Sequence, residues 1–252
     1  MKFVTFNIRC DYNQDGNNSF CYRKPYILDK LNKEKPNVIC FQEVLPHVAT
    51  WLKESLTEYY VLGCGRDEHL EDEQTAIAFN KLQYQLISMN TFWLSKTPLI
   101  PGSRYEKQSI CPRTCTEVVL QDLKTKEIIR ILNTHLDHEG SEARVLGMEQ
   151  ILTYLEEVSL FKSATVILTG DFNAYPHDPE ITMISTVGHL VDLTADLEGT
   201  FHEFGTLSKH EKIDYIFASQ DVVCSKKELW KDQVKGVFLS DHYPVCVEIS
   251  TK

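Results

Sequence analysis

The chain has 252 residues, of which 42% are hydrophobic, so it is long enough for one large α/β domain or two small ones. Its 36 acidic and 26 basic residues give a formal net charge of −10. Such a charge repels polyanions wherever no basic groove intervenes, although an acidic metal site would account for part of it. The composition therefore argues against tight nonspecific binding to duplex DNA and disfavours a nuclease that works on long nucleic acids.

The N-terminal residues run directly into an apolar, strand-like segment, without the basic segment, apolar stretch and cleavage site of a signal peptide. No apolar run approaches the roughly 20 residues that a membrane-spanning helix requires. The sequence therefore predicts a cytoplasmic protein without a transmembrane segment.

Eight cysteines are scattered along the chain, and several lie inside apolar runs. Buried free thiols explain this pattern better than disulfides do. The closest pair, Cys111 and Cys115, lacks the two-residue spacing and the companion pair of a zinc site, so we do not expect a zinc centre there.

Runs rich in Val, Ile, Phe or Thr indicate strands, and apolar residues three and four positions apart indicate helices. In chain order these patterns predict strand 2–7, helix 23–34, strand 37–42, helix 46–57, strands 75–80, 84–93, 115–123 and 128–135, helix 142–159, and strands 164–169, 213–218 and 244–250. Ser141 precedes the third helix and is expected as its N-cap. The polar segments 63–74 and 94–114 are long enough to be functional loops.

Strands outnumber helices in this series, and the strand pairs within 75–93 and 115–135 have the form of hairpins around turn residues. A purely parallel, doubly wound sheet therefore fits poorly, and an α/β sandwich with mixed sheets fits better. The chain contains no internal repeat, low-complexity tract or long Pro/Gly/Ser linker, so residues 1–252 are expected to form a single domain.

Six strand-like apolar runs end in polar side chains that are suited to catalysis. They lead to Asn7, Gln42-Glu43, Asn133-Thr134-His135, Gly170-Asp171-Phe172-Asn173, Ile213-Asp214-Tyr215 and Ser240-Asp241-His242. Strands that end at one rim of a sandwich would gather these side chains into a single cleft. Asp214 supports this interpretation most strongly, because a carboxylate inside an apolar strand costs several kcal/mol unless it has a partner such as a histidine.

The other side chains also have ordinary structural explanations. Asn7 and the segment 171–173 contain residues that are common in turns. Glu43 precedes a predicted helix, whose N-terminus favours an acidic residue. A lone histidine such as His135 or His242 is usually a polar residue whose hydrogen bonds are satisfied. The order in which the motifs follow one another is therefore more informative than any one of them.

The ordered set resembles the endonuclease/exonuclease/phosphatase superfamily of metal-dependent phosphoesterases, which includes pancreatic deoxyribonuclease, apurinic endonucleases, neutral sphingomyelinases, inositol-polyphosphate phosphatases and deadenylases. The five motifs that follow the family's order are Gln42-Glu43, Asn133-Thr134-His135-Leu136, Gly170-Asp171-Phe172-Asn173, Ile213-Asp214-Tyr215-Ile216 and Ser240-Asp241-His242. The resemblance spans nearly the whole chain and implies a four-layer α/β sandwich, with two mixed sheets face to face and helices outside. Residues 7–9 and 133–140 are similar to a bacterial subgroup whose substrates are undefined.

The resemblance also implies a metal site. Carboxylate and amide oxygens suit hard cations, and Mg²⁺ typically takes one or two carboxylates while it keeps several waters. Glu43 is the first candidate ligand, Asn7 would support the metal or its waters, and the family pattern implies Asp241 as a further ligand. Mg²⁺ is the expected cofactor, with Mn²⁺ as the alternative.

For the attacking water, the expected base is His242, because a neutral imidazole held by a carboxylate accepts a proton near pH 7. Asp214 would fix its tautomer, as the acid of a catalytic triad does. Asp171 would align the water or assist proton transfer, and Asn173 would donate a hydrogen bond to the phosphoryl oxygen. The family leaves the division of labour between Asp171 and His242 open.

His135 resembles a second histidine of the family, which contacts the phosphate and protonates the leaving group. Glu73 is a candidate for the acidic residue that orients this histidine. Arg113 is a candidate for a bidentate phosphate clamp, with a solvated surface arginine as the alternative.

The leading functional hypothesis is an Mg²⁺-dependent phosphodiesterase or phosphatase, with a small or lipid-derived substrate favoured over long DNA by the negative charge. A nuclease acting on DNA or RNA is the alternative, and a catalytically inactive binding module is the second alternative. The complete set of candidate catalytic residues argues against the binding module, which would not need it. The sequence does not fix the substrate or the oligomeric state.

Overall fold

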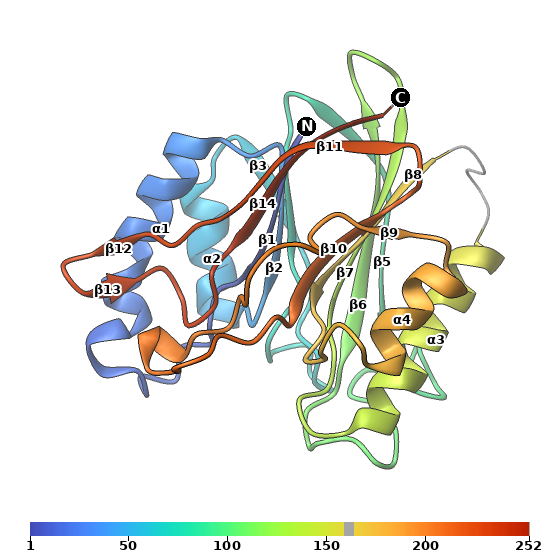
Figure 1. The fold of residues 1–252 in the computed structure, drawn as a ribbon, viewed down its shortest axis with the longest axis horizontal. Coiled ribbons are helices and arrows are strands. Elements are labelled where there is room, and N and C mark those ends of the chain that lie inside the picture. Colours follow the sequence, from blue (N-terminus) through green and yellow to red (C-terminus); the bar gives the residue numbers. More distant parts are fainter. Residues whose placement is uncertain (159–163, 252) are drawn as a thin grey trace.

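The structure is a computed structural model that describes residues 1–158 and 164–251. Two six-stranded sheets with mixed strand directions lie face to face, and helices cover the outer face of each sheet (Figure 1). The predicted α/β class and the four-layer sandwich are therefore confirmed.

The first sheet carries the two N-terminal helices. Its strands are β1 (Lys2–Asn7), β2 (Val38–Gln42), β3 (Tyr59–Leu62), β4 (Ile77–Asn80), β11 (Val222–Leu229) and β14 (Val245–Thr251), in the order β11-β14-β1-β2-β4-β3. Helices α1 (Phe20–Glu34) and α2 (Pro46–Ser55) bury Ile27, Leu31, Val48 and Leu52 against this sheet.

The second sheet carries the other two helices. Its strands are β5 (Tyr84–Trp93), β6 (Thr114–Asp122), β7 (Ile128–His135), β8 (Thr165–Asp171), β9 (Val191–Asp192) and β10 (Asp214–Ala218), in the order β5-β6-β7-β8-β10-β9. Helices α3 (Ser141–Glu157) and α4 (Pro179–Thr186) pack on its outer face through Met148, Ile151, Ile181 and Ile184. A separate ribbon consists of β12 (Gln233–Val234) and β13 (Val237–Phe238), and short 3₁₀ turns occupy Gly16–Asn18 and Glu203–Gly205.

The core follows from the alternation of side chains along each strand. In β1, Phe3 lies in the layer between the two sheets, whereas Val4 and Phe6 lie in the layer under α1 and α2. Strand β2 divides its residues in the same way, because Cys40 faces the other sheet and Phe41 faces the helices. Both faces of these strands are buried, which explains why they read as continuous apolar runs.

Most of the predicted elements are present, and their ends agree to within three residues. Residue 159, the last of the predicted helix 142–159, lies outside the described residues. Helix α1 begins at Phe20 rather than at residue 23, because Phe20 is itself buried in the core. The sequence analysis missed β3, β9, β11, α4 and the β12–β13 ribbon. Strand β11 lies at a sheet edge, and all of its residues are exposed or half-buried. Half of them are polar or charged, so the strand lacks a continuous apolar run.

The prediction that Ser141 caps α3 was wrong. Gly140 occupies the N-cap, and Ser141 is the first residue of the helix. The backbone N–H of Gly140 donates to the Asp137 carboxylate at 2.6 Å, which turns the chain into the helix. A Cβ atom at position 140 would collide with the carbonyl oxygen of Lys107, so only glycine fits there.

The register of the strands places the candidate residues at one rim of the sandwich. Parallel pairing of β7 with β8 sets His135 beside Asp171, and antiparallel pairing of β10 with β8 sets Asp214 beside the same Asp171. Two of the six runs therefore differ from the expectation that a strand ends at this rim. Asp214 begins its strand rather than ending it, since β10 runs antiparallel, and His242 follows the short ribbon and reaches the rim through a β-bridge with Phe201.

All eight cysteines are free, as expected. Cys10, Cys40, Cys115 and Cys246 are buried, whereas Cys21 is exposed, so the expectation of burial holds for only part of the set. In the described part of the chain, no helix has the length and apolar character needed to cross a membrane.

Candidate active site

The centre of the rim is a buried aspartate–histidine pair. His242 Nδ1 lies 2.8 Å from Asp214 Oδ2, and both side chains are almost completely shielded from solvent. The predicted need of Asp214 for a partner is therefore met by His242. The other ring nitrogen of His242 lies 3.8 Å from Asp171 Oδ2, so the imidazole sits between two carboxylates.

Asn7 connects the two sheets at this point. Its side-chain N–H groups donate to Glu43 at 2.8 Å and to Asp171 at 2.9 Å, and its Oδ1 accepts from the backbone N–H of Arg9 at 3.0 Å. The second carboxylate oxygen of Glu43 accepts from the backbone N–H of Cys10 at 2.8 Å. Asn7 thus holds the carboxylates of Glu43 and Asp171 at a fixed separation.

Two of these residues adopt unusual backbone conformations. Glu43 has φ 61° and Asn173 has φ 47°, in the left-handed region that side chains other than glycine seldom occupy. Asn173 also donates its backbone N–H to Asp171 at 3.0 Å and its side-chain N–H to the carbonyl of Leu136 at 3.0 Å. Strain of this kind persists where surrounding contacts impose it, and it is concentrated at functional sites.

The electrostatics separate the two candidate bases. Burial and the charge of Asp214 raise the pKa of Asp171 to about 7. Burial alone would lower the pKa of His242, but the charge of Asp214, their hydrogen bond and the charges of Asp171 and Asp241 raise it to about 10. The carboxylates around His242 therefore favour its protonated form, and burial beside Asp214 favours the protonated form of Asp171.

The donor atoms near Glu43 fit a divalent cation. Glu43, His135 and Asp171 each offer a ligand atom, and these atoms lie within 4.8 Å of one another. Burial would raise the pKa of Glu43, but its hydrogen bonds from Asn7 and Cys10 and the positive charge of His242 hold it below the ordinary value, so the carboxylate is ionised. The two carboxylates suit Mg²⁺ or Mn²⁺.

Asp241 lies apart from this donor group. One of its oxygens is 3.3 Å from the guanidinium of Arg9, and the other accepts from Ser240 at 3.0 Å. Burial raises the pKa of Asp241, although the charges of His242 and Arg9 oppose this shift. The structure thus brings Glu43 and Asp171 together, and it places Asp241 against a cationic side chain.

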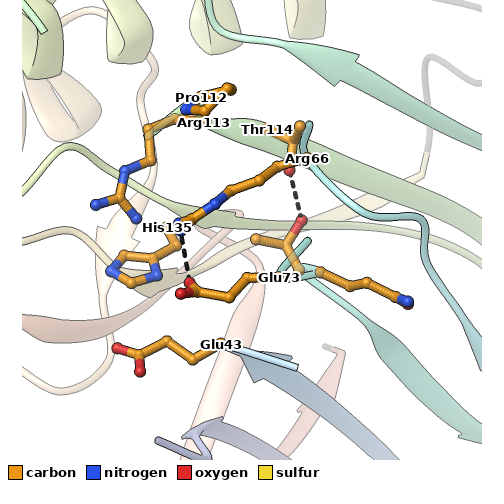
Figure 2. Close-up of a pocket in the computed structure, with 9 residues that line it drawn as sticks. Glu43, Arg66, Glu73, Pro112, Arg113, Thr114 and His135 are labelled. Atoms are coloured by element: carbon orange, nitrogen blue, oxygen red, sulfur yellow. Dashed lines mark hydrogen bonds and ion pairs between the residues drawn. The ribbon is translucent and has the colours of Figure 1, made fainter. Parts of the chain in front are cut away.

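His135 lies on the opposite side of Asp171 from Asp214, with its Nε2 3.6 Å from the Asp171 carboxylate. Burial and the positive charges of Arg113 and Arg66 lower its pKa well below the ordinary value, so the imidazole is neutral. Figure 2 shows the side chains of Arg66 and Arg113 both reaching toward His135. Glu73 forms an ion pair with Arg66 at 2.9 Å, and no hydrogen bond joins it to His135 within the described residues.

These residues surround one cavity of about 430 Å³. The candidate residues that line it are Glu43, Glu73, Arg113, His135, Asp171, Asn173, Asp241 and His242. Asn7 and Asp214 lie behind this wall and act on it through their hydrogen bonds. Arg113 is only 4% exposed, so the alternative of a solvated surface arginine was wrong.

The sequence analysis missed several lining residues. Arg9 belongs to the segment 7–9 that resembles the bacterial subgroup, and Arg66 lies in a loop that was expected to be functional, so their positions gave some signal. The sequence positions of Phe201 and Glu211 gave no such signal. They reach the cavity because Phe201 pairs with both Glu211 and His242 in isolated β-bridges, a long-range contact that no local pattern encodes.

Comparison with known proteins identifies the family to which this site belongs. The sequence profile of the Endonuclease/Exonuclease/phosphatase family matches residues 4–242. The chain belongs to this family. Its members are phosphoesterases, so the fold and the general class of chemistry follow from membership. No curated protein matches the chain significantly.

Three solved structures of similar bacterial proteins cover essentially the whole chain. A family member from Bacteroides vulgatus is 30% identical, with a TM-score of 0.93 and coverage of 100% of this chain and 98% of the other. The mannosyl-6-phosphatase of Bacteroides thetaiotaomicron is 26% identical, with a TM-score of 0.92 and coverage of 99% of both chains. A protein of unknown function from Enterococcus faecalis is 28% identical, with a TM-score of 0.90 and full coverage of both chains.

Proposed function

We propose that this family member is a divalent-metal-dependent phosphatase that hydrolyses small phosphate esters, with sugar phosphates as the first candidates. The observation that carries the proposal is the convergence of Glu43, Asp171, the His242–Asp214 pair and Arg113 on one cavity. The likeness to a mannosyl-6-phosphatase over nearly the full length of both chains supports a sugar phosphate. Among metals, the donor set favours Mg²⁺, with Mn²⁺ as the alternative.

Glu43 and Asp171 would hold the cation, with His135 close enough to complete the donor group. A bound divalent cation would neutralise a phosphate oxygen and stabilise the negative charge that develops on the leaving oxygen. The direct metal role predicted for Asp241 receives less support, because Arg9 already neutralises its carboxylate.

Two groups are candidates to accept the proton of the attacking water. His242, oriented by Asp214, is the base expected from the sequence, and the carboxylates around it raise its pKa. Asp171, whose carboxylate lies 3.8 Å from the other ring nitrogen of His242, would align the water or assist the proton transfer. Asp214 orients His242 and stabilises its positive charge. Asn173 holds Asp171 through its backbone and faces the cavity for the phosphoryl oxygen.

The two alternative functions receive less support. A nuclease must attract a polyanion, and the net charge of −10 opposes this. A binding module would not need a buried carboxylate–imidazole pair. Desolvation of such a pair costs stability, and in a binding module no catalytic role would explain that cost. A lipid-derived ester would be compatible with the chemistry, but the polar cavity lining favours a polar leaving group.

A substrate screen tests the proposal. The purified protein with Mg²⁺ or Mn²⁺ should hydrolyse p-nitrophenyl phosphate and a hexose 6-phosphate faster than bis-(p-nitrophenyl) phosphate, sphingomyelin, short RNA or plasmid. Chelation by EDTA should abolish the activity, and Asp171→Asn, prepared in parallel, should exclude a contaminating enzyme. Efficient cleavage of plasmid or RNA alone would replace the proposal with the nuclease alternative, and no turnover of any ester would favour the binding module.

A further inference from the structure

A small recess opens beside His135 at one end of the cavity. Its polar walls are the side chains of Glu43, Arg66, Glu73, Arg113 and His135 (Figure 2). The volume of the recess is about 10 Å³, which accommodates one water-sized atom. A single oxygen atom therefore fills this space.

Arg113 is the unsatisfied group in this recess. Its Nη2 lies 2.7 Å from His138 Nδ1, but its Nε and Nη1 are buried and have no hydrogen-bond partner within the described chain. The nearest carboxylate, that of Asp137, is 3.6 Å from Nε and already accepts hydrogen bonds from Ser109 and Gly140. Leaving buried guanidinium N–H groups unpaired is costly, so a ligand oxygen is the partner that this geometry lacks.

Arg66 places a second guanidinium at the same recess. Its Nε lies 2.8 Å from Asp72 and its Nη1 lies 2.9 Å from Glu73, while the indole of Trp93 donates to its backbone carbonyl at 2.5 Å. These contacts fix its position and use only part of the five N–H donors of a guanidinium. Asp72 and Glu73 also offset the charge of Arg66, as Asp137 at 3.6 Å offsets part of the charge of Arg113, so the two guanidinium groups offer the recess mainly hydrogen-bond donors.

We propose that the recess binds an unsubstituted oxygen of a terminal phosphate group through Arg113 and Arg66, and that it selects phosphate monoesters over diesters. The inference rests on the proposed function and assigns its preference for monoesters to two named side chains. A monoester has three nonbridging oxygens, which match the cation site at Glu43, the donors Asn173 and His242, and the recess. A diester has only two, so it leaves one of these three positions without an oxygen.

Charge reinforces this selection. A phosphate monoester carries roughly 1.5 to 2 negative charges near neutral pH, whereas a diester carries one. A buried guanidinium interacts more strongly with the more highly charged group, because the surroundings screen it poorly. Removal of Arg113 should therefore harm monoester hydrolysis more than diester hydrolysis.

The test compares two esters of the same leaving group in the Mg²⁺-loaded protein. Arg113→Met should lower kcat/KM for p-nitrophenyl phosphate by roughly 10² to 10³, the size of the loss when one donor to transition-state charge is removed. The loss on bis-(p-nitrophenyl) phosphate should not exceed about tenfold, and inhibition by inorganic phosphate should weaken at least about tenfold. Arg66→Lys should show the same selectivity with a smaller loss.

Arg104→Met is the matched control, because Arg104 is exposed on the same loop and donates only to the carbonyl of Ser109 at 3.0 Å. It should leave both activities unchanged. Equal losses of Arg113→Met on the two esters, or unchanged inhibition by phosphate, would overturn the inference. If Arg113→Met does not fold, Arg113→Lys decides the question, since it keeps the charge but loses the bidentate geometry and should still lower the monoester-to-diester ratio.

The proposed function and this inference fail in different ways. If the protein hydrolyses neither ester, the proposed function fails, and calorimetric binding of inorganic phosphate to the Mg²⁺-loaded protein still tests the recess. If Arg113→Met weakens the binding of phosphate at least about tenfold, the result supports phosphate binding in the recess. Equal binding to the wild-type protein and to Arg113→Met would refute it.

Discussion

At the residue scale, Asp214 and His242 should act as one unit, because the carboxylate serves catalysis only by orienting and charging the imidazole 2.8 Å away. His242→Gln or Asp214→Asn should each lower kcat by roughly 10² to 10⁴, the range expected when a positioned proton donor or acceptor is lost. The double variant should be little worse than His242→Gln alone, since Asp214 then has nothing left to orient. Steady-state kinetics of the three variants check this.

The alternative outcome has a definite meaning. Additive losses in the double variant would show that Asp214 has a role apart from His242. Metal affinity supplies the control, because neither residue belongs to the donor group that contains Glu43. The Mg²⁺ concentration for half-maximal activity should therefore change less than it does in Glu43→Gln.

His202 should control the acid stability of the fold. The ring is fully buried, stacks on Tyr243 at 3.9 Å and accepts a hydrogen bond from the backbone N–H of Gly205 at 3.1 Å. Burial and the charges of His242 and His210 lower its pKa to about 3, against an ordinary value of about 6.5. Between these values the unfolded chain binds more protons than the folded chain, so stability is full above pH 6.5 and falls as the pH decreases toward 3.

Urea unfolding at pH 8 and pH 5 measures this contribution. With partial solvent screening, His202 should account for roughly 1 to 2 kcal/mol of the stability lost between the two pH values. His202→Asn, which keeps an acceptor for the backbone, should be less stable at pH 8 but lose less on acidification. Exposed His177→Asn is the control, and an unchanged pH dependence in His202→Asn would refute the assignment.

The candidate site shows what single residues reveal from sequence. The apolar neighbours of Asp214 in the sequence predict a desolvated carboxylate, which requires a hydrogen-bond or charge partner. In the structure that partner is His242. The protonation of His242 was not foreseeable, since it depends on the combined charges of Asp171, Asp214 and Asp241 around one ring. The loop that holds Arg66 was expected to be functional, but its neighbours in sequence give no indication that Arg66 itself reaches His135.

At the element scale, the β7–β8 pair carries the site, and Gly170 sets its spacing. Gly170 has φ 142° and pairs with Thr134, and a Cβ atom there would collide with the Thr134 carbonyl oxygen. Gly170→Ala should therefore destabilise the fold by about 2 to 4 kcal/mol, because the strands must separate. The folded fraction should also lose at least about tenfold in kcat, since Asp171 follows directly and small displacements of catalytic groups are costly.

Gly236→Ala provides the comparison. Gly236 also has a positive φ of 85°, but nothing lies within 4 Å of an added Cβ. Backbone strain alone should cost about 1 kcal/mol there and leave kcat unchanged. Similar stability in the two alanine variants, measured by chemical denaturation, would mean that β7 and β8 tolerate the extra methyl group.

The sequence predicts where most of the strands lie, but it does not predict which strands pair with one another. The sequence predicts β1, β2, β7 and β8 because both faces of these strands are buried, which gives each of them a continuous apolar run. The pattern of β11 did not predict a strand, because its residues are exposed or half-buried and half of them are polar or charged. The direction of β10 was also hidden, because pairing with β8 is a long-range choice, and this direction puts Asp214 at the start of its strand.

At the scale of the whole molecule, the negative charge and the local arginines act in opposite directions. The net charge of −10 repels polyanions at long range, whereas Arg66 and Arg113 at the cavity would bind one small anion at short range under the proposed function. Salt screens long-range interactions over a distance of about 8 to 10 Å and affects buried contacts much less. A small phosphate ester and a long nucleic acid should therefore respond differently to ionic strength.

The last prediction follows from this difference. Between 50 and 200 mM NaCl, kcat/KM for p-nitrophenyl phosphate or a hexose 6-phosphate should change by less than about threefold, because the ester is bound by buried groups. Any residual cleavage of plasmid should fall far more steeply, since a polyanion bound through several phosphates loses roughly 10³ to 10⁵ in affinity over the same range. Initial rates at constant Mg²⁺ provide the measurement, with choline chloride as a second salt to exclude a specific effect of sodium. Plasmid cleavage that persists at 200 mM NaCl and exceeds hydrolysis of the small esters would show that a local basic surface outweighs the net charge.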